Sequence, residues 1–287
     1  MIAQKKFLVT GLVRDCAKSV KDEVMRIKDA LSGAGNISWL LIESDSADST
    51  LSVLSELRND IPDFDYISLG VLRDKIALRT ERIAYCRTVY VKEVRSNPKY
   101  ADISYVVVAD FDGMNSGLTA ESIDSCWARD DWDVCTANQK GSYYDLWALR
   151  QDEWSPNDCF EQYRFYLSMR QPAFKAYYAS VFSRMIRLPT DADWIEVNSA
   201  FGGLAIYKKA VMDIAEYNGL TVDGKEVCEH VSFHKMVRQQ GYRIFINPKL
   251  INNKSSHHTY KTFGKIVALF FLGRNGFDRL KQIFGGR

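Results

Sequence analysis

One apolar run near the middle of the chain ends in a pair of carboxylates. Val106 to Ala109 are four consecutive apolar residues, mostly β-branched, which predicts a strand buried on both faces. Because side chains alternate along a strand, Asp110 and Asp112 should lie on one side and Phe111 on the other. Placing two carboxylates together at the end of a buried strand costs free energy unless a cation lies between them. Mg²⁺ and Mn²⁺ are suitable cations because they prefer oxygen ligands. We therefore expect a ligand crevice at the carboxyl end of this strand.

Strand and helix patterns alternate on both sides of this run. Before it, the expected strands and helices, in turn, are Phe7–Val13, Lys18–Leu31, Ser38–Glu43, Thr50–Arg58, Tyr66–Leu69 and Lys75–Arg95. After it come an expected helix at Thr119–Ala128, strands at Trp132–Asn138 and Tyr242–Pro248, and a helix from about Glu226 to Gln240. This alternation predicts an α/β fold whose parallel sheet is flanked by crossover helices.

Charge is distributed unevenly over the 287 residues. Residues 260–287 hold six basic residues and one acidic residue, a net +5, whereas the remainder has 32 basic and 35 acidic residues, a net −3. The length suits one large domain, expected over residues 1–259, followed by a basic amphipathic tail over 260–287. This asymmetry argues against nucleic acid as the main ligand and favours an anionic membrane surface as a partner of the tail.

The cysteines and the amino-terminal stretch bear on the compartment. The six cysteines show no Cys-x-x-Cys pair and no regular spacing, which is typical of reduced thiols in a cytosolic protein: Cys16, Cys86, Cys126, Cys135, Cys159 and Cys228. The apolar run Phe7–Val13 is too short and too interrupted for a signal peptide, and no stretch has the length of a membrane span. We expect a cytoplasmic protein, peripheral on the cytoplasmic face of a membrane through its tail.

Asp110-Phe111-Asp112 resembles the Asp-x-Asp motif of nucleotide-sugar glycosyltransferases of the GT-A fold. The resemblance covers about residues 7 to 259 through ordered motifs. It implies a mixed, mainly parallel sheet, with a nucleotide-binding lobe over about 1–130 and an acceptor lobe over 131–259. It also implies that Asp110 and Asp112 hold Mn²⁺ or Mg²⁺ on the donor diphosphate, with His257 or His258 as a third ligand.

The same resemblance places a donor site in this chain. Arg82 corresponds to a basic residue that reaches the donor, and Gly202 and Gly203 to a small-residue loop beneath the donor sugar, where glycine lets backbone amides approach a ligand. Asp110 and Phe111 are expected at the donor as well. The base and ribose are expected against the loops after the first two strands, at Gly11, Leu12, Val13, Arg14, Glu43 and Asp45.

In this resemblance, Glu229-His230 stands at the position of the Glu-Asp-type motif of GT-A enzymes and departs from it at the second residue. This departure leaves the general base open; if the enzyme inverts, Glu229 is the expected base for the acceptor hydroxyl. Proteins hold sugars with an aromatic ring beside a carboxylate, which makes acceptor-site candidates of Tyr143, Asp145 and Trp147, with His230 beside them. A finer similarity to fungal capsule-associated α-mannosyltransferases, over 133–138, 144–150 and the Phe-Gly-Gly-Leu-Ala run at 201–205, implies a mannose donor and polysaccharide biosynthesis.

Two other functions stay open beside this one. Asp110-Phe111-Asp112-Gly113 also resembles the nucleophile loop of haloacid-dehalogenase-like phosphatases and phosphotransferases, with Asp110 as the nucleophile. That fold normally begins with the nucleophile strand, whereas over a hundred residues precede it here. A catalytically silent sugar- or lipid-binding protein is the third alternative. The sequence best fits a metal-dependent glycosyltransferase that uses a nucleoside-diphosphate sugar and a glycan or lipid-linked acceptor.

Overall fold

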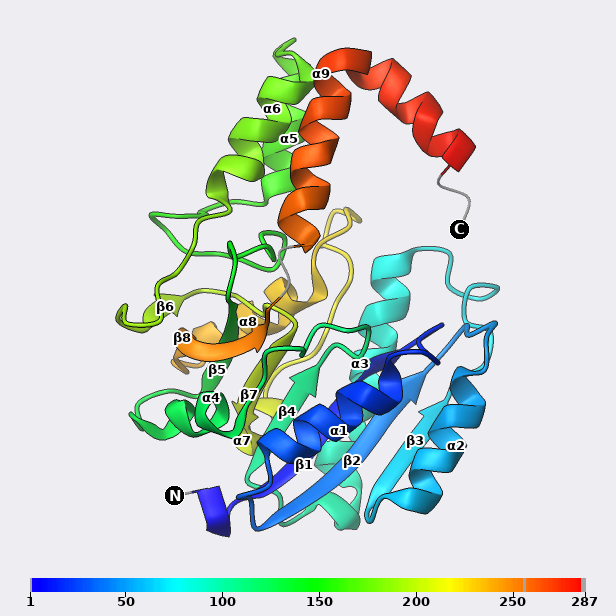
Figure 1. Ribbon diagram of the computed structural model, residues 1–287, viewed down its shortest axis with the longest axis vertical. Helices are drawn as coiled ribbons and strands as arrows, with labels where there is room; N and C mark the ends of the chain where they lie inside the picture. The colour runs from blue at the N-terminus through cyan, green and yellow to red at the C-terminus, as the bar shows by residue number, and fades with distance from the viewer. Residues whose placement is uncertain (1, 255–256, 285–287) are drawn as a thin grey trace.

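One twisted sheet, covered by helices on both faces, runs through the protein (Figure 1). The structure is a computed structural model that describes residues 2–254 and 257–284, with the side chains of 257–259 and 280–284 outside that description. The strands are β1 (Lys6–Val13), β2 (Asn36–Glu43), β3 (Phe64–Ser68), β4 (Tyr105–Ala109), β5 (Val134–Gln139), β6 (Ile195–Val197), β7 (Leu204–Lys208) and β8 (Ile244–Asn253). Within the described residues they form one sheet in the order β3-β2-β1-β4-β7-β5-β8-β6.

Helices and strands alternate as expected as far as β5. The α-helices are α1 (Val20–Ala30), α2 (Thr50–Asp60), α3 (Arg79–Ser96), α4 (Ala120–Asp124), α5 (Cys159–Ser168), α6 (Ala173–Ser180), α7 (Lys209–Met212), α8 (Glu229–Gln239) and α9 (His257–Phe284). Short 3₁₀ turns are η1 (Ile2–Gln4), η2 (Pro98–Tyr100), η3 (Ser125–Trp127) and η4 (Phe182–Arg184).

The sheet is mixed but mainly parallel, which confirms the predicted fold class. β1 pairs in parallel with β2 and β4, and β2 pairs in parallel with β3. β7 is antiparallel to both β4 and β5, and β6 is antiparallel to β8. Because the parallel strands are joined by crossover helices, β1, β2 and β4 all end at the same edge of the sheet.

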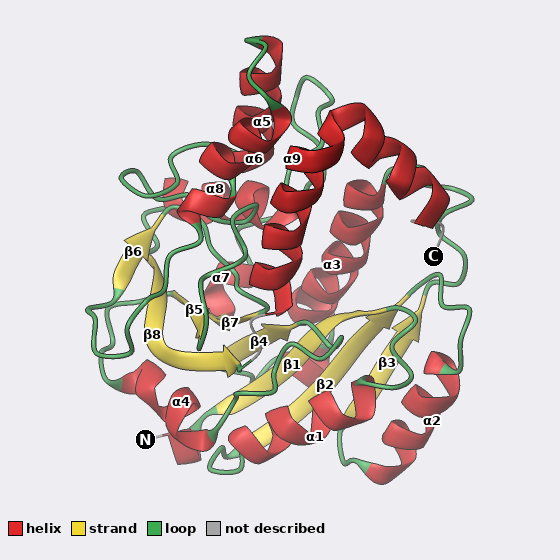
Figure 2. Ribbon diagram, turned by 45° about the horizontal axis from the view of Figure 1, so that its top comes forward, coloured by secondary structure: helices red, strands yellow, loops and turns green. Residues whose placement is uncertain are grey.

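The two faces of β4 pack into separate hydrophobic cores. Val106 and Val108 belong to the core that includes α3 and α8, whereas Val107 and Ala109 belong to the core that includes α1 and α2. All four side chains are fully buried. Figure 2 shows α1 and α2 on one side of the sheet and α3 on the other. The continuous apolar run of β4 is therefore the expected sequence of a strand covered on both faces.

Several helices differ at their ends from the ranges that the sequence predicts. The helix expected from Lys75 begins at Arg79, because Arg82 Nη1 donates to the carbonyls of Ile76 (2.7 Å) and Ala77 (2.8 Å) and holds those residues as a loop. The helix expected at 119–128 is divided into α4, capped by Thr119, and η3. These differences concern capping and local hydrogen bonds, which periodicity does not encode.

The aromatic stretch after β5 and the carboxyl-terminal tail pack together. Residues 159–180 form α5 and α6, and α9 lies alongside α6 (Figure 1), with the Phe174 and Phe270 rings 5.0 Å apart. The tail helix begins at His257, three residues before the expected 260. Across the described residues, no helix combines the length and hydropathy that crossing a bilayer requires. All six cysteines are free and buried.

Candidate active site

A cleft of about 650 Å³ lies where β1, β2 and β4 end. This is the edge at which the sequence predicts a ligand crevice, because the carboxyl ends of parallel strands meet there. Its wall also includes one face of α3, residues 144, 145, 147 and 148, and the start of α8. Six carboxylates and four guanidinium groups line it, a net −2: Asp15, Asp45, Asp110, Asp112, Asp145, Glu229, Arg14, Arg79, Arg82 and Arg87.

Both carboxylates of the Asp-x-Asp motif line the cleft. The Asp110 side chain is 39% exposed, whereas Phe111 is 1% exposed and packs in the core on the α1 side. The alternation of β4 therefore continues beyond its last residue, as the sequence predicts. Gly11 makes room for the Phe111 ring: a Cβ at residue 11 would lie 2.6 Å from Phe111 Cε2 and 2.1 Å from the Ala109 carbonyl oxygen. Gly11 thus has a packing role, and its expected contact with the nucleotide stays a prediction.

Buried and partly buried hydrogen bonds fasten the loop after β4 to the first turns of α1 and to its N-cap, Ser19. Asn115 Nδ2 donates to the Asp110 carbonyl oxygen at 2.7 Å and to Glu23 Oε2 at 2.6 Å, and the Asn115 backbone N–H donates to the same Glu23 oxygen at 2.9 Å. Ser19 Oγ donates to the Phe111 carbonyl oxygen at 2.8 Å. These bonds fix the backbone on which the Asp-x-Asp carboxylates are mounted.

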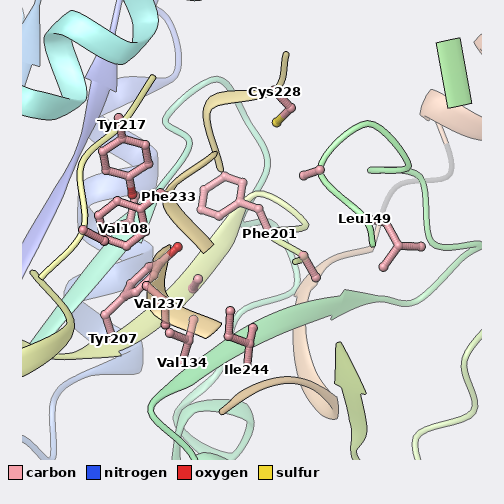
Figure 3. Packing of buried hydrophobic residues seen from close by; sticks show 14 of the residues in the cluster. Val108, Val134, Leu149, Phe201, Tyr207, Tyr217, Cys228, Phe233, Val237 and Ile244 are labelled. Carbon is pink, nitrogen blue, oxygen red and sulfur yellow. The ribbon is translucent and has the colours of Figure 1, made fainter. Parts of the chain in front are cut away.

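Arg87 of α3 is buried beside the acidic end of β4. Its Nε donates to Glu229 Oε1 at 2.9 Å, and its Nη2 lies 4.0 Å from Asp110 Oδ1. The rings of Phe201 and Tyr217 lie 5.3 Å and 5.6 Å from its guanidinium carbon. Figure 3 shows both rings in the packed cluster that includes β7 and α8. A guanidinium group paired and stacked in this way is held rigidly, so it joins α3, α8 and the end of β4.

Negative charge accumulates around Asp110. Desolvation raises the pKa of the Asp110 carboxyl; Arg87 opposes this rise, and Asp112, Asp145 and Glu229 add to it. Desolvation also raises the pKa of Asp145, against the hydrogen bond from the Gly202 N–H. Four carboxylates thus share the neighbourhood of one guanidinium group, and this part of the cleft carries an excess of negative charge.

The residues present fit a divalent cation. Mg²⁺ and Mn²⁺ prefer carboxylate oxygens and usually keep positions for phosphate or water, so the pair Asp110 and Asp112 is a suitable partial ligand set. A bound dication would also favour the ionised form of Asp110. Among the described residues, no three His, Cys, Asp or Glu side chains gather as a metal-binding group. The predicted third ligand, His257 or His258, is at the start of α9, and both side chains lie outside the described part.

The loops after β1 and β2 are tied together at the cleft. Asp15 and Asp45 have φ values of 48° and 62°, which are uncommon for residues other than glycine. The Ala47 N–H donates to Asp15 Oδ1 at 2.7 Å, and the Arg73 N–H donates to Asp45 Oδ1 at 2.9 Å. Although desolvation raises it, hydrogen bonds from Arg73 keep the pKa of Asp45 below its usual value. Such strained, fixed backbone is typical of ligand-binding loops.

Most of the predicted donor-site residues meet in this cleft. It is lined by Leu12, Val13, Arg14, Asp45, Arg82, Asp110 and Phe111. Glu43 is instead 1% exposed; its Oε1 accepts from the Ser46 N–H at 3.0 Å and its Oε2 accepts from Ser68 Oγ. The described residues that line the cleft do not include Gly11 or Glu43. Gly11 supports the predicted nucleotide loops through packing, and Glu43 supports them through hydrogen bonds.

Gly202 and Gly203 position two carboxylate residues, Asp145 and Asp110, through backbone hydrogen bonds. The described residues that line the cleft do not include either glycine. The Gly202 N–H donates to Asp145 Oδ2 at 2.9 Å, and the Gly203 carbonyl accepts from the Asp110 N–H at 2.9 Å. Their φ values of 74° and 88° lie in the region that favours glycine. The Gly202 amide is therefore already bonded to Asp145, and the expected contact of this loop with a donor sugar stays a prediction.

The acceptor-site candidates are divided between the cleft and the core. Asp145, Trp147 and His230 line the cleft. Tyr143 is fully buried and packs edge-on against Trp154 at 5.3 Å, so its neighbour Tyr144 takes the expected place in the wall. This corrects the prediction for Tyr143: the position faces the core.

His230 lies mainly inside the protein although it borders the cleft. It is 2% exposed, stacks on Phe201 at 3.9 Å, and its Nε2 is 3.7 Å from Glu229 Oε1. Desolvation lowers the pKa of His230 well below its usual value, and Arg87 adds to this. His230 is therefore a neutral aromatic neighbour of Glu229 at physiological pH.

Further residues line the cleft beyond those predicted. The face of α3 that forms part of the wall carries Arg79, Arg82, Ile83, Cys86 and Arg87. Their spacing of i, i+3, i+4, i+7 and i+8 is that of one helical face, so the position of Arg82 alone implies the other four. Ser44, between Glu43 and Asp45, and Phe201, next to Gly202, also line the cleft and belong to loops that the sequence predicts for the donor. Cys228 lines the cleft as well, and no sequence pattern singled it out.

Searches with the sequence alone find no protein-family model and no curated protein that matches. The structure, in contrast, is similar to the mannosyltransferase PcManGT from Pyrobaculum calidifontis, solved with GDP-Man and Mn²⁺, with a TM-score of 0.50, 11% identity and 92% of this chain covered. TarS residues 1–349 from S. aureus gives a TM-score of 0.47 and 14% identity over 92% of this chain. The chain spans 64% of the length of each. The similarity shows the fold: this chain has a GT-A-type α/β architecture.

Proposed function

We propose that this protein is a metal-dependent glycosyltransferase that moves a sugar from a nucleoside-diphosphate sugar to a hydroxyl of a glycan or lipid-linked acceptor. The observation that carries the proposal is the pair Asp110 and Asp112 in a cleft that also presents four guanidinium groups. Carboxylates provide ligands for a divalent cation, and guanidinium groups provide donors for phosphate oxygens. The cleft volume, about 650 Å³, lies in the range of small-ligand sites.

In this proposal the nucleoside lies against the loops after β1 and β2, and the diphosphate lies by the acidic end of β4. Arg14, Arg79 and Arg82 would bind phosphate oxygens from the wall. Arg82 is oriented for this by its bonds to two loop carbonyls. Asp110 and Asp112, with His257 or His258, would hold Mn²⁺ or Mg²⁺, which when bound stabilises the charge on the departing nucleoside diphosphate.

Glu229 is the proposed proton acceptor for the acceptor hydroxyl. It lines the cleft at the first residue of α8, and Arg87 fixes its orientation through one carboxylate oxygen. Asp145 is the alternative, because burial raises its pKa and makes it a stronger base at neutral pH. Glu229→Gln and Asp145→Asn separate them: the base variant should lose about 100-fold or more in kcat with donor affinity retained.

Mannose is the first donor sugar to test. The finer similarity to fungal α-mannosyltransferases and the GDP-Man in the P. calidifontis neighbour both support it. Trp147 and Tyr144 would provide the aromatic surface for an acceptor sugar, beside Asp145 and His230. The cytoplasmic location and a part in polysaccharide biosynthesis belong to this proposal.

A binding and turnover series tests the proposal. Thermal-shift measurements with UDP, GDP, CMP and their sugars, with and without Mn²⁺, should give a metal-dependent shift with one nucleotide, followed by release of the nucleoside diphosphate when an acceptor is added. A phosphotransferase that uses Asp110 as nucleophile would instead hydrolyse p-nitrophenyl phosphate and bind no nucleotide. A catalytically silent binding protein would bind without turnover. Either result would overturn the proposal.

A further inference from the structure

We infer that the helical lobe formed by α5, α6 and α9 is a docking surface for an anionic lipid bilayer. The starting observation is that α9 has two apolar faces. One face packs inward: Leu269 is 2% exposed and Ile266 is half-buried against the core. The other faces solvent, with exposures of 72%, 54%, 38%, 58% and 76% at Tyr260, Phe263, Val267, Phe270 and Phe271.

The exposed apolar residues of α9 form one stripe. Their spacing of 3, 4, 3 and 1 residues places them on a single face of the helix. A surface helix normally presents polar residues to water on this face, because its apolar stripe is used by the core. Here the core already uses the face of Leu269, so the outer stripe is available for a second apolar partner.

Contacts between aromatic rings extend the stripe onto α6. The Phe263 and Phe182 rings are 6.0 Å apart, and the Phe182 and Tyr178 rings are 5.8 Å apart. Tyr178 is itself 52% exposed. On α5 and just after it, Phe165 and Met169 are each 55% exposed. The apolar surface therefore belongs to the lobe and not to the tail alone.

A bend brings part of the stripe to one end of the molecule. α9 changes direction at Gly273, where φ is 62° and ψ is −178°, directly after the exposed Phe270, Phe271 and Leu272. Figure 1 shows this bend at the top of the molecule, beside the upper ends of α5 and α6. An approaching flat surface would therefore meet this end of the lobe before it met the sheet.

Charge favours an anionic surface as the partner. Residues 159–180, which span α5 and α6, hold three basic residues and one acidic residue, and residues 257–284 hold five and one, which gives the lobe a net charge of +6. Since the whole chain carries +2, the remainder carries −4. Exposed Lys175, Lys261 and Arg274 lie within the lobe. Anionic lipid headgroups attract such a lobe and repel the body, which sets the orientation of docking.

The combination of residues favours a bilayer over a protein partner. Phenylalanine and tyrosine with flanking lysine and arginine are typical of helices that lie in the bilayer interface. Lysine, in contrast, is depleted in protein–protein interfaces. The apolar stripe would enter the headgroup boundary, and the basic side chains would remain at the level of the phosphates.

Vesicle flotation tests this inference on the whole chain, without nucleotide. We expect binding to phosphatidylcholine vesicles that contain about one third phosphatidylserine, little binding to pure phosphatidylcholine, and release at high salt. Tyr260→Ser/Phe271→Ser should weaken binding to the anionic vesicles at least about tenfold. Val71→Ser/Val222→Ser, at exposed positions outside the lobe, is the matched control and should bind as the wild type does.

The experiment distinguishes failure of this inference from failure of the proposed function, because vesicle binding and nucleotide binding are measured separately. A wild type that does not float with anionic vesicles, or a lobe variant that floats as well as the wild type, would overturn it. So would a stable dimer in light scattering that the lobe variant disrupts, because a second copy would then cover the stripe. Nucleotide binding by the lobe variant, measured in parallel, reports separately on the cleft and should be unchanged.

Discussion

Arg87 Nε donates to Glu229 Oε1 at 2.9 Å, and this bond joins α3 to the first residue of α8 beside the cleft. Both side chains are buried, with relative exposures of 6% and 8%. The pair therefore has two effects: it satisfies the charge of each partner inside the protein, and it orients the carboxylate that we propose as the proton acceptor.

Removal of Arg87 alone should destabilise the fold. Arg87→Met leaves Glu229 as a buried, unpaired carboxylate, for which we expect a loss of about 3 to 5 kcal/mol in the free energy of unfolding. Urea denaturation monitored by circular dichroism measures it. Arg87→Met/Glu229→Gln removes both charges and should recover at least about 1 kcal/mol relative to the single variant. If the two substitutions are simply additive, the buried pair is not the reason for the loss.

Gly11 is predicted to be required by packing. In Gly11→Ala the new methyl group would lie 2.1 Å from the Ala109 carbonyl oxygen and 2.6 Å from the Phe111 ring, so β1 and β4 would have to separate. We expect a loss of more than about 2 kcal/mol in unfolding free energy. Gly33→Ala is the matched control, since its methyl group would be 3.7 Å from Ile2 and should change stability by less than about 0.5 kcal/mol. Equal effects would refute the packing role.

His234 makes stability depend on pH. It is fully buried, with Ser199 Oγ 3.0 Å from Nδ1 and Tyr207 Oη 3.0 Å from Nε2. Desolvation, with a smaller contribution from Arg87, lowers its pKa to about 3. Between pH 6.5 and about 3 the unfolded chain therefore binds a proton that the folded chain excludes. The stability that the neutral ring provides is fully present above pH 6.5 and is lost as the pH falls.

A comparison with His234→Asn isolates this contribution, because the variant lacks the titrating group. At pH 5 the expected loss from one such histidine is about 2 kcal/mol. The stability advantage of the wild type over the variant should therefore be about 2 kcal/mol smaller at pH 5 than at pH 7.5, as measured by urea unfolding. An advantage that is the same at both pH values would mean that His234 is not held neutral.

The fold could be predicted from the sequence largely because β4 and its neighbours have strong, regular patterns. The run Val106–Ala109 has no polar residue, and both of its faces are covered, as expected. A strand after Gly203 was expected, but its antiparallel direction and its place between β4 and β5 were not, since hydrophobic periodicity carries no information on strand direction or order. Helix ends also differed, because capping bonds such as those of Arg82 are set by tertiary contacts.

The site could be predicted where it depends on backbone geometry. Strand alternation placed Asp110 and Asp112 together, and the ends of β1 and β2 brought the loops that we propose for the nucleotide into the same cleft. Residues whose role is set by packing were harder to assign. Tyr143 and Tyr144 differ by one position, and only the fold decides which faces the core. Gly202 is used by the Asp145 carboxylate, a contact between distant segments that no local motif encodes.

Calorimetric titration of nucleoside diphosphates in the presence of Mn²⁺ tests the central claim most directly. Wild type and Asp124→Asn, a substitution at an exposed position of α4, should both bind one nucleotide with an affinity that disappears on chelation of the metal. Asp112→Asn should remain folded, with an unchanged melting temperature, and bind that nucleotide at least about 100-fold more weakly. An Asp112→Asn protein that binds as tightly as the wild type, or a wild type that binds none of the nucleotides, would contradict the account.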